Sequence, residues 1–418
     1  MPTSNLKDFL IAGAGIVGTC VALELKKRHP TANICVLDKE IHGHAHSSGR
    51  NSGVIHAGFY YSPGSLKSKM TAAGNSLLTN YCQERGIPIN ACGKLVVAKD
   101  ESEHQRLSML LDRGNKNNAQ VELLDLKQAK EIEPRVKTFS HALWSPKTKV
   151  SDPVAVLKAL QKDAQDLGVE FNFGCQVLGR QNNSAVQTKN GVYEFGYFIN
   201  AAGLQADIVA HSFGFGLKYQ ILPFKGLYLY SDERAPKFRT NIYPVPDLNY
   251  PFLGVHVTQT LDGRSKLGPT AIPALWREQY AQLENFKLNE FSRISARHGW
   301  FVIKNGRQFF KMAIEEMRKY NRKFMVKRAQ ELATDIENTH FVKWGKPGIR
   351  AQLVNLETAK LEMDFLIEGD SRSLHILNAV SPGWTCSLPF SSFVCDNVER
   401  FQKLNSHSNP QVVKESHP

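Results

Sequence analysis

The spacing of apolar positions predicts a β-α-β unit at the start of the chain. Residues 9–12 form a short continuous apolar run, as expected of a strand buried in a parallel sheet. A helix follows to about Arg28 and ends before Pro30, because proline cannot continue a helix. Residues 34–37 form a second buried strand, which ends at Asp38.

Similar patterns predict the elements that follow. Pro153 in a first turn preceded by polar residues is a favourable helix start. We predict helices at about 65–84, 101–115 and 154–167, and strands at 93–98, 169–173 and 193–200.

The pattern changes at about residue 220. Strands at 222–230 and 252–260, with a proline-rich turn at 243–246 between them, indicate an antiparallel sheet. Residues 274–336 are predicted to be mostly helical, and strands return at 365–367 and 374–377. A chain of 418 residues exceeds the size of one ordinary core, so we expect about two domains.

The glycines Gly13, Gly15 and Gly18 lie between the first strand and the first helix in a G-x-G-x-x-G motif. Such a turn lets the backbone approach a pyrophosphate, whose charge faces the helix N-terminus. Asp38 follows 20 residues after Gly18 and is suited to accept hydrogen bonds from a ribose. The motif therefore predicts dinucleotide binding, and by itself it fits both FAD and NAD.

Two features favour FAD. The chain has no second G-x-G-x-x-G motif for a nicotinamide cofactor, and a long loop at 47–58 follows Asp38. Because no tethering signature is evident, we expect the FAD to be bound non-covalently.

Several further segments match one family in order and spacing. They are residues 51–58, 64–67, 92–95, 201–203, 223–226, 242–246, 251–256 and 348–352. Together they resemble the L-2-hydroxyglutarate dehydrogenase/oxidase family, within the D-amino-acid-oxidase-like class of FAD enzymes, over about residues 8–400. The chain departs from this family at Arg50, where histidine is usual, at Thr270, where asparagine is usual, and around Trp384.

The resemblance implies an α/β fold in which a Rossmann-like FAD-binding domain is interleaved with an α+β substrate domain built on an antiparallel sheet. We place the FAD-binding domain at 1–90, 151–215 and 346–405, and the substrate domain at 91–150 and 216–345. Residues 406–418 are expected to form a disordered tail, because they are polar.

The resemblance also implies oxidation of a 2-hydroxy acid, L-2-hydroxyglutarate, to 2-oxoglutarate. Hydride would pass to flavin N5 and the hydroxyl proton to a base. Histidine suits this base because its pKa lies near neutrality. His56, in the loop expected beside the flavin, and His256, on the polar face of a predicted strand, are the two candidates.

The remaining site predictions concern binding. Arg350 is the best candidate to bind the substrate carboxylate through two parallel hydrogen bonds. Candidates for a second carboxylate contact are Lys225, Tyr243 and Arg277. Candidates for FAD contact are Gly13, Gly15, Gly18, Asp38, Arg50, Asn51, Ser52, Gly53, Gly203, Ser381, Gly383, Trp384 and Thr385. We expect no metal site, since His42, His44 and His46 alternate in a loop without evident acidic partners.

The formal net charge of +13 suits an anionic partner. The basic segment at 276–327 is either a solvated surface or a contact with an anionic membrane, at which electrons would pass to a quinone. The expected electron acceptor is oxygen or a quinone. The absence of C-x-x-C pairs, and a first strand too early for a signal peptide, favour a cytoplasmic protein, either free or peripheral to the inner face of a membrane.

Other functions remain open from the sequence. An amine or amino-acid oxidase, or a glycerol-3-phosphate-type dehydrogenase, would use the same fold. A flavin-containing RNA-modifying or RNA-binding protein would use the basic charge, but the chain has no recognisable RNA-binding motif, so we expect no nucleic-acid partner.

Overall fold

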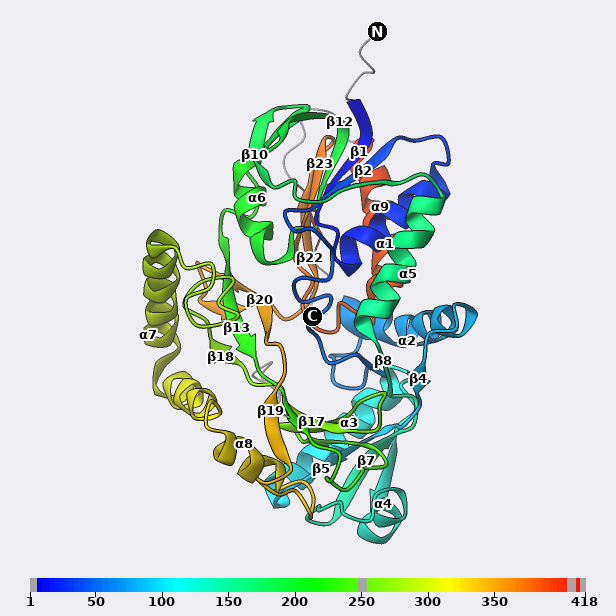
Figure 1. The fold of residues 1–418 in the computed structure, drawn as a ribbon, viewed down its shortest axis with the longest axis vertical. Coiled ribbons are helices and arrows are strands. Elements are labelled where there is room, and N and C mark those ends of the chain that lie inside the picture. Colours follow the sequence, from blue (N-terminus) through cyan, green and yellow to red (C-terminus); the bar gives the residue numbers. More distant parts are fainter. Residues whose placement is uncertain (1–5, 247–253, 404–410, 414–418) are drawn as a thin grey trace. The chain divides into compact units, whose positions relative to one another are not determined.

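The computed structural model describes residues 6–246, 254–403 and 411–413. The chain divides into two compact units (Figure 1). The first unit comprises Met1–Asn51, Pro153–Leu222 and Ala351–Pro418, and the second comprises Ser52–Asp152 and Pro223–Arg350. Each is described by itself below.

A largely parallel sheet forms the first unit. Its strands lie in the order β24 (Gln411–Val413), β22 (Leu366–Gly369), β23 (Ser373–Asn378), β12 (Gly191–Asn200), β1 (Leu6–Ala12), β2 (Ile34–Leu37) and β9 (Glu170–Asn172). The strands from β23 to β9 are parallel, whereas β22 and β24 are antiparallel to their neighbours. A hairpin of β10 (Val177–Asn182) and β11 (Ala185–Thr188) pairs with β12.

Three helices of the first unit pack together. α1 (Ile16–Arg28) contacts both α5 (Pro153–Asp166) and α9 (Ser387–Gln402). Arg28 joins α1 to α9, since its Nη1 lies 2.7 Å from Asp396 Oδ1 and 3.1 Å from Glu399 Oε1. The short η1 (Gly203–Gln205) and α6 (Ala206–Ser212) follow β12. The predicted β-α-β start and the helix at α5 are confirmed.

A mainly antiparallel sheet forms the second unit. Its order is β19 (Phe341–Trp344), β14 (Leu229–Ser231), β17 (Ser265–Gly268), β16 (His256–Gln259), β15 (Asn241–Pro244), β5 (Lys94–Val97), β7 (His141–Ser145) and β6 (Glu122–Asp125). Only the pairing of β15 with β5 is parallel among these described strands. The prediction of an antiparallel sheet in this part of the chain is therefore confirmed.

The two faces of this sheet differ because side chains alternate along each strand. Leu95, Ile242, Val257 and Leu267 form an apolar face, which packs against α8 (Arg322–Ala329) in one buried cluster. The opposite face carries Lys94, Val96, Tyr243 and His256, and part of it is covered by α3 (Glu101–Lys116). The other short helix beside this sheet is α4 (Leu126–Ile132).

The first predicted domain boundary is wrong. We placed it at residue 90, whereas the second unit begins at Ser52. The reason is local pairing: β3 (Val54–Ile55) and β4 (Ile89–Asn90) both pair with β8 (Lys149–Ser151), and α2 (Leu66–Glu84) contacts both β3 and β4. The other divisions fall at 152/153, 222/223 and 350/351, a few residues beyond the predicted positions.

The chain passes between the units along β13 (Tyr219–Gly226) and β20 (Gly348–Asn355). Within the second unit β13 pairs with β18 (Ile272–Pro273), and within the first β20 pairs with β21 (Lys360–Leu361). The predicted strand at 222–230 is thus two strands, β13 and β14, with a break at 227–228.

Three further predictions need correction. Residues 241–244 form β15 rather than the start of a turn, because they pair with β5. Residues 274–287 are turns rather than helix, consistent with the positive φ of 56° at Asn285. In the predicted disordered tail, Gln411–Val413 pairs with β22. Of the predicted strand at 252–260, residues 252 and 253 lie outside the described part.

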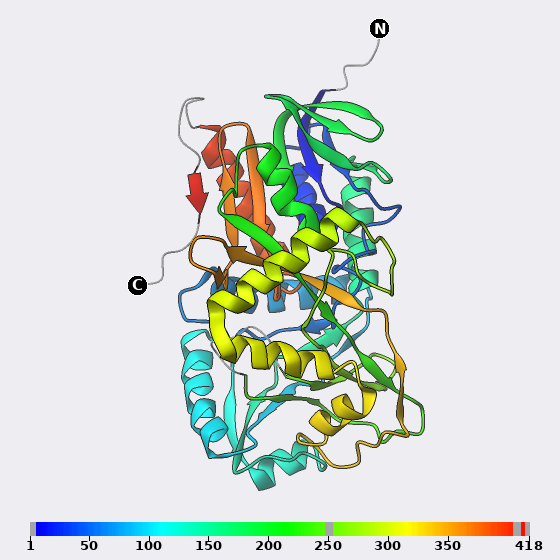
Figure 2. The ribbon, with the colours of Figure 1, turned by 90° about the vertical axis from the view of Figure 1, so that its left-hand side faces the viewer.

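The longest helix, α7 (Leu288–Arg318), bends at Gly306, whose φ of 73° and ψ of −166° are not helical. Figure 2 shows its two arms. Among the described residues, no helix combines the length and the apolar character needed to span a bilayer.

Candidate functional site

The glycine turn between β1 and α1 leaves no room for side chains. Gly13 has a φ of +108°, and a Cβ there would lie 2.4 Å from the carbonyl oxygen of Ala201. A Cβ on Gly18 would lie 1.9 Å from the carbonyl oxygen of Gly13. The backbone is therefore bare where α1 begins, and this geometry fits a pyrophosphate at a helix N-terminus.

Asp38 and a loop around Ser48 surround this turn. Asp38 Oδ2 accepts a hydrogen bond from the Ala14 amide at 2.7 Å, and its Oδ1 accepts one from the Glu40 amide at 2.9 Å. Burial raises the pKa of Asp38 above its usual value. Because a carboxylate has about four acceptor positions, Asp38 retains capacity for ribose hydroxyls.

The loop after Asp38 is held by its own side chains. Ser48 Oγ accepts a hydrogen bond from the Ile16 amide at 2.9 Å, in the first turn of α1. Asn51 Nδ2 donates to the Ser48 carbonyl at 3.0 Å, and Arg50 Nε donates to the Ala45 carbonyl at 2.5 Å. Arg50 and Asn51 therefore shape the loop in this structure. Ser48, which our prediction omitted, contacts the glycine turn directly, as Asp38 does.

The other predicted FAD contacts of the first unit follow parallel strands. Gly203 lies after β12, and Ser381, Gly383, Trp384 and Thr385 lie between β23 and α9. Carboxyl ends of parallel strands meet at one edge of a sheet, where ligands of such folds bind. These loops therefore gather at the edge that carries Gly13 and Asp38.

Ser52 and Gly53 belong to the second unit. The carbonyl of Ser52 accepts a hydrogen bond from Lys266 Nζ at 2.8 Å, and that of Gly53 accepts one from the Ser151 amide at 2.9 Å. Their backbones are thus fixed within that unit, and their predicted contact with FAD stays a prediction.

The second unit brings Tyr243 and His256 together on one sheet face. β15 and β16 are antiparallel with Ile242 opposite Val257, so Tyr243 lies opposite His256. Their rings stack with centroids 3.6 Å apart, and both side chains are buried. As predicted from the alternation, His256 lies on the face opposite Val257, which belongs to the apolar cluster.

His56 and Arg350 are close enough to influence this pair. His56 follows β3, and its carbonyl accepts a hydrogen bond from Asn75 Nδ2 at 3.0 Å. Burial, together with the positive charges of Lys94 and Arg350, lowers the pKa of His56 to about 3. The pKa of His256 is well below its usual value for the same reasons. Both imidazoles are therefore neutral at pH 7, but they are weaker bases than a histidine with the near-neutral pKa on which our choice of base rested.

Two predicted substrate contacts have other partners. Arg277 is buried beside Glu290, whose Oε1 accepts a hydrogen bond from the Arg277 amide at 2.9 Å and lies 3.8 Å from its Nε. The Lys225 carbonyl accepts a hydrogen bond from Thr270 Oγ1 at 2.8 Å, and burial lowers the pKa of the Lys225 ammonium. Their predicted contacts with the substrate stay predictions. Thr270 also accepts a hydrogen bond from the Leu227 amide at 3.0 Å.

Sequence reasoning missed Lys94 and Lys266, two buried lysines on the polar face of the sheet. Lys266 lies opposite Thr258 on β16, and Lys94 opposite Asn241 on β15. A signal was present for Lys94, since a lysine at the head of the apolar run Leu95-Val96-Val97 is unusual in a buried strand.

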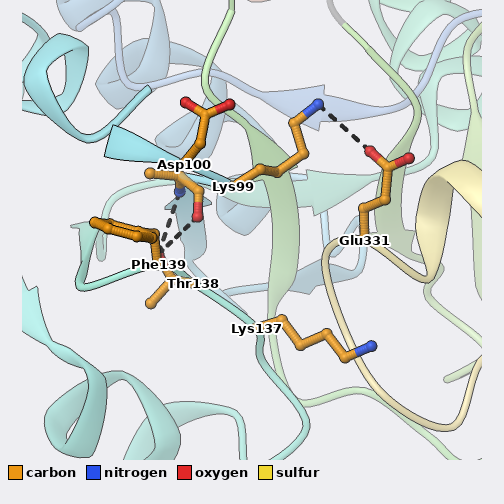
Figure 3. Close-up of a pocket in the computed structure, with 7 residues that line it drawn as sticks. Lys99, Asp100, Lys137, Thr138, Phe139 and Glu331 are labelled. Carbon is orange, nitrogen blue, oxygen red and sulfur yellow. Dashed lines mark hydrogen bonds and ion pairs between the residues drawn. The ribbon is translucent and has the colours of Figure 1, made fainter. Parts of the chain in front are cut away.

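Two polar features elsewhere do not add to this site. A surface hollow of about 490 Å³ is lined by Lys99, Asp100, Lys137, Thr138, Phe139 and Glu331, among others (Figure 3). In this hollow Lys99 Nζ lies 3.4 Å from Glu331 Oε2. None of the residues predicted to bind FAD or substrate lines it. In the histidine-rich loop, His46 Nε2 lies 2.9 Å from Glu40 Oε1, so our expectation that these histidines lack an acidic partner was wrong.

A family model described as "FAD dependent oxidoreductase" matches residues 8–391. The chain belongs to this family of FAD-dependent oxidoreductases. FAD is its cofactor, and the α/β fold with a Rossmann-like FAD-binding part is confirmed.

Curated relatives of this flavoprotein share most of its length. It is 36% identical to the mitochondrial L-2-hydroxyglutarate dehydrogenase of Nematostella vectensis, with 94% of this chain and 91% of the relative covered. It is 35% identical to the L-2-hydroxyglutarate dehydrogenase of Indibacter alkaliphilus (93% and 97% covered) and 32% identical to that of Escherichia coli K12 (96% and 95%). The predicted resemblance is thus confirmed.

Solved structures share the fold of the flavoprotein. The FAD-bound L-α-glycerophosphate oxidase of Mycoplasma pneumoniae superposes with a TM-score of 0.75 at 21% identity, covering 99% of this chain and 97% of that one. Glycine oxidase of Geobacillus kaustophilus has a TM-score of 0.72 at 19% identity, with 96% of each covered.

The dinucleotide turn gives a first prediction. Gly18→Ala should weaken FAD binding by about tenfold or more, because its Cβ would displace the Gly13 backbone. Gly299→Ala is the matched control, since nothing lies within 4 Å of a Cβ at this helical position. The FAD-to-protein ratio after dialysis measures the effect. A Gly18→Ala protein with full FAD occupancy would show that the turn does not hold the cofactor.

Proposed function

We propose that this flavoprotein oxidises L-2-hydroxyglutarate to 2-oxoglutarate. The names of its relatives support this substrate. The observation that carries the proposal is the cluster of the second unit, in which two neutral histidines lie within the electrostatic reach of Arg350 and Lys94. A dicarboxylate alcohol carries two negative charges, which the positive potential of these cations favours, and a hydroxyl proton, for which a neutral imidazole is the acceptor.

The chemistry divides between cofactor and side chains. Oxidation of the alcohol removes a hydride from C2 and a proton from the hydroxyl, and bound FAD supplies the hydride acceptor at N5. The proton is accepted by a neutral imidazole, for which we propose His56, with His256 as the alternative base. Arg350 binds the carboxylate beside the reacting carbon through paired hydrogen bonds.

The environment of each histidine suits a different role. His256 is stacked on Tyr243, and its Nε2 is buried without a hydrogen-bond partner among the described residues. His56 instead lies in the segment between β3 and α2, where its backbone carbonyl accepts a hydrogen bond from Asn75 Nδ2. We assign proton transfer to His56, in the loop expected beside the flavin, and the support of the substrate's hydroxyl group to His256.

The reaction and its base are tested together. Anaerobic mixing with L-2-hydroxyglutarate should bleach the flavin absorbance of the wild-type protein, whereas glycine and glycerol 3-phosphate should not. His56→Ala should slow this reduction by about 10²–10⁴-fold, the usual loss when a general base is removed, with normal FAD content. If His56→Ala reduces at the wild-type rate and His256→Ala does not, the base is His256. If neither slows, or if glycine or glycerol 3-phosphate is the better substrate, the proposal fails.

Arg350 gives a separate prediction. Arg350→Lys keeps the charge but loses the paired geometry, so KM should rise clearly. Arg350→Met should raise KM further, since hydrogen bonds to charged groups contribute roughly 1.5–3 kcal/mol each. FAD content should stay normal in both, and Arg293→Met, at an exposed position of α7, is the control. Steady-state kinetics decide it, and an unchanged KM in both variants would remove Arg350 from the substrate site.

We propose in addition that the second arm of α7 contacts an anionic membrane, where a quinone takes up the electrons. Phe310, Ile314 and Met317 are spaced by four and three residues and are 53%, 46% and 49% exposed, so they form one apolar stripe. Exposed Arg307 and Lys311 lie on the same arm. An exposed apolar stripe beside basic residues is typical of interfacial helices.

Vesicle binding tests this surface. The wild-type protein should sediment with vesicles rich in phosphatidylserine and much less with neutral phosphatidylcholine vesicles. Replacing Phe310, Ile314 and Met317 by serine should reduce the bound fraction by about tenfold or more, given about 25 cal/mol per Å² of buried apolar surface. The control is Leu217→Ser, which removes an exposed leucine of the first unit. Equal binding of the stripe variant and the control would contradict this contact.

A further inference from the structure

Lys94 is fully buried and unpaired within the described structure. Its side chain has no exposed surface, and its Nζ makes no hydrogen bond to any described residue. Three aromatic rings surround the ammonium instead, with Nζ 4.6 Å from the ring centre of Phe59 and 4.7 Å from those of Tyr60 and Tyr243. Each cation–π contact of this kind contributes about 0.5–2 kcal/mol. Together they offset only part of the free-energy cost of burying the ammonium.

The sheet register connects Lys94 to the histidines. Lys94 and Tyr243 lie on the same face of neighbouring strands, because Val96 is the partner of Tyr243 and side chains alternate. Tyr243 in turn stacks on His256 at 3.6 Å. The ammonium is therefore one ring away from His256, and its charge acts on both His256 and His56.

Burial of a cation without a carboxylate partner is unfavourable and is found mostly where function requires it. Lys319, by contrast, is also buried but forms an ion pair with Glu316. The Lys94 charge is unneutralised by the protein, so an anionic ligand near the two histidines would gain its full attraction. In a water-poor site this attraction is much larger than at a protein surface.

We propose that Lys94 is a positioning residue that sets the affinity of this site for doubly charged carboxylates, acting through the layer of Tyr243 and His256 rather than by direct contact. The proposal rests on the proposed function for the location of the substrate. It assigns Lys94 to the attraction of the second carboxylate, for which Lys225, Tyr243 and Arg277 were the candidates from the sequence.

The charge of Lys94 changes near neutral pH. Burial lowers the pKa of its ammonium to about 7, so the side chain is cationic below this pH and increasingly neutral above it. A dicarboxylate favours the cationic form. Its dissociation constant should therefore be low at acidic pH and rise as the pH passes through the Lys94 pKa.

Other titratable groups that face Lys94 and the histidines could also change charge near the Lys94 pKa. These groups are His56, Tyr60, Cys92, Tyr228, Tyr243, His256, Lys266, Lys319 and Arg350. The pKa values of both histidines lie far below neutrality. Burial raises the pKa of Cys92 to about 11 and that of Tyr228 to about 12, and it holds the pKa of Tyr60 well above its usual value. Burial raises the pKa of Tyr243 in the same way. Apart from Lys94, only Lys266 has a shifted pKa inside the window, at about 8.

Binding of glutarate to the oxidised holoenzyme tests the proposal without turnover. Its dissociation constant is measured from the perturbation of the flavin spectrum between about pH 6.5 and pH 9, where glutarate is doubly ionised. The wild-type value should rise about tenfold across this range, which corresponds to about 1.4 kcal/mol of lost attraction. Butyrate, with one carboxylate, should show a smaller change.

Variants separate Lys94 from Lys266. Lys94→Met should bind glutarate about tenfold more weakly at about pH 6.5 and lose most of the pH dependence, whereas Lys94→Arg should bind tightly across the range. Lys266→Met should retain the dependence with a midpoint near the Lys94 pKa. Lys343→Met, at an exposed position of the same sheet, is the control for the exchange itself.

The outcomes are distinct from those of the proposed function. If L-2-hydroxyglutarate fails to reduce the flavin but glutarate binding depends on Lys94, the substrate is wrong and the role of Lys94 stands. If the wild-type protein oxidises L-2-hydroxyglutarate while Lys94→Met and Lys94→Arg keep wild-type glutarate affinity and pH dependence, the role of Lys94 is refuted. If the Lys94→Met variant loses its FAD, the wild-type protein alone decides. A glutarate dissociation constant that does not change with pH in the wild-type protein would refute the role of Lys94.

Discussion

The alternation of side chains across one sheet is the constraint on which the second unit depends. β5, β15, β16 and β17 each place apolar residues on one face, where Leu95, Ile242, Val257 and Leu267 join a single buried cluster. The same alternation forces their neighbours onto the opposite face. A shift of one residue in any strand would exchange the two faces, so the core and the polar cluster are specified together.

This coupling explains how an unfavourable set of charges is tolerated. Lys94 and Lys266 lie in strands whose other faces are fully buried, so their backbones cannot move to expose the ammonium groups. The local response is a lower pKa for each lysine and for both histidines. The apolar face supplies the stability, and the polar face retains two lysines whose pKa values lie near neutrality.

The sequence predicted the first unit better than the second, for a physical reason. Gly13, Gly18 and Asp38 act through backbone geometry over fewer than 30 residues, and this leaves a local pattern that can be read directly. The segment containing His56 was assigned to the wrong unit, because its partner strand β8 lies about 95 residues away and leaves no local signal. β15 was misread for a similar reason. Two prolines suggest a turn, whereas the parallel pairing of Asn241–Pro244 with β5 is invisible in the sequence.

The candidate site shows the same division. His256 was placed on the correct face, because alternation along a strand is local. Arg277 was chosen for its charge, yet Glu290 of α7 accepts a hydrogen bond from its backbone amide and places a carboxylate oxygen 3.8 Å from its Nε. Lys94 was overlooked, although a lysine at the head of an apolar strand is itself a local anomaly. Arg277 and Lys94 are both buried cations, and what distinguishes them is the presence of a carboxylate partner, which only the three-dimensional structure supplies. A buried cation with such a partner contributes little field to a ligand, whereas one without it contributes most of its charge.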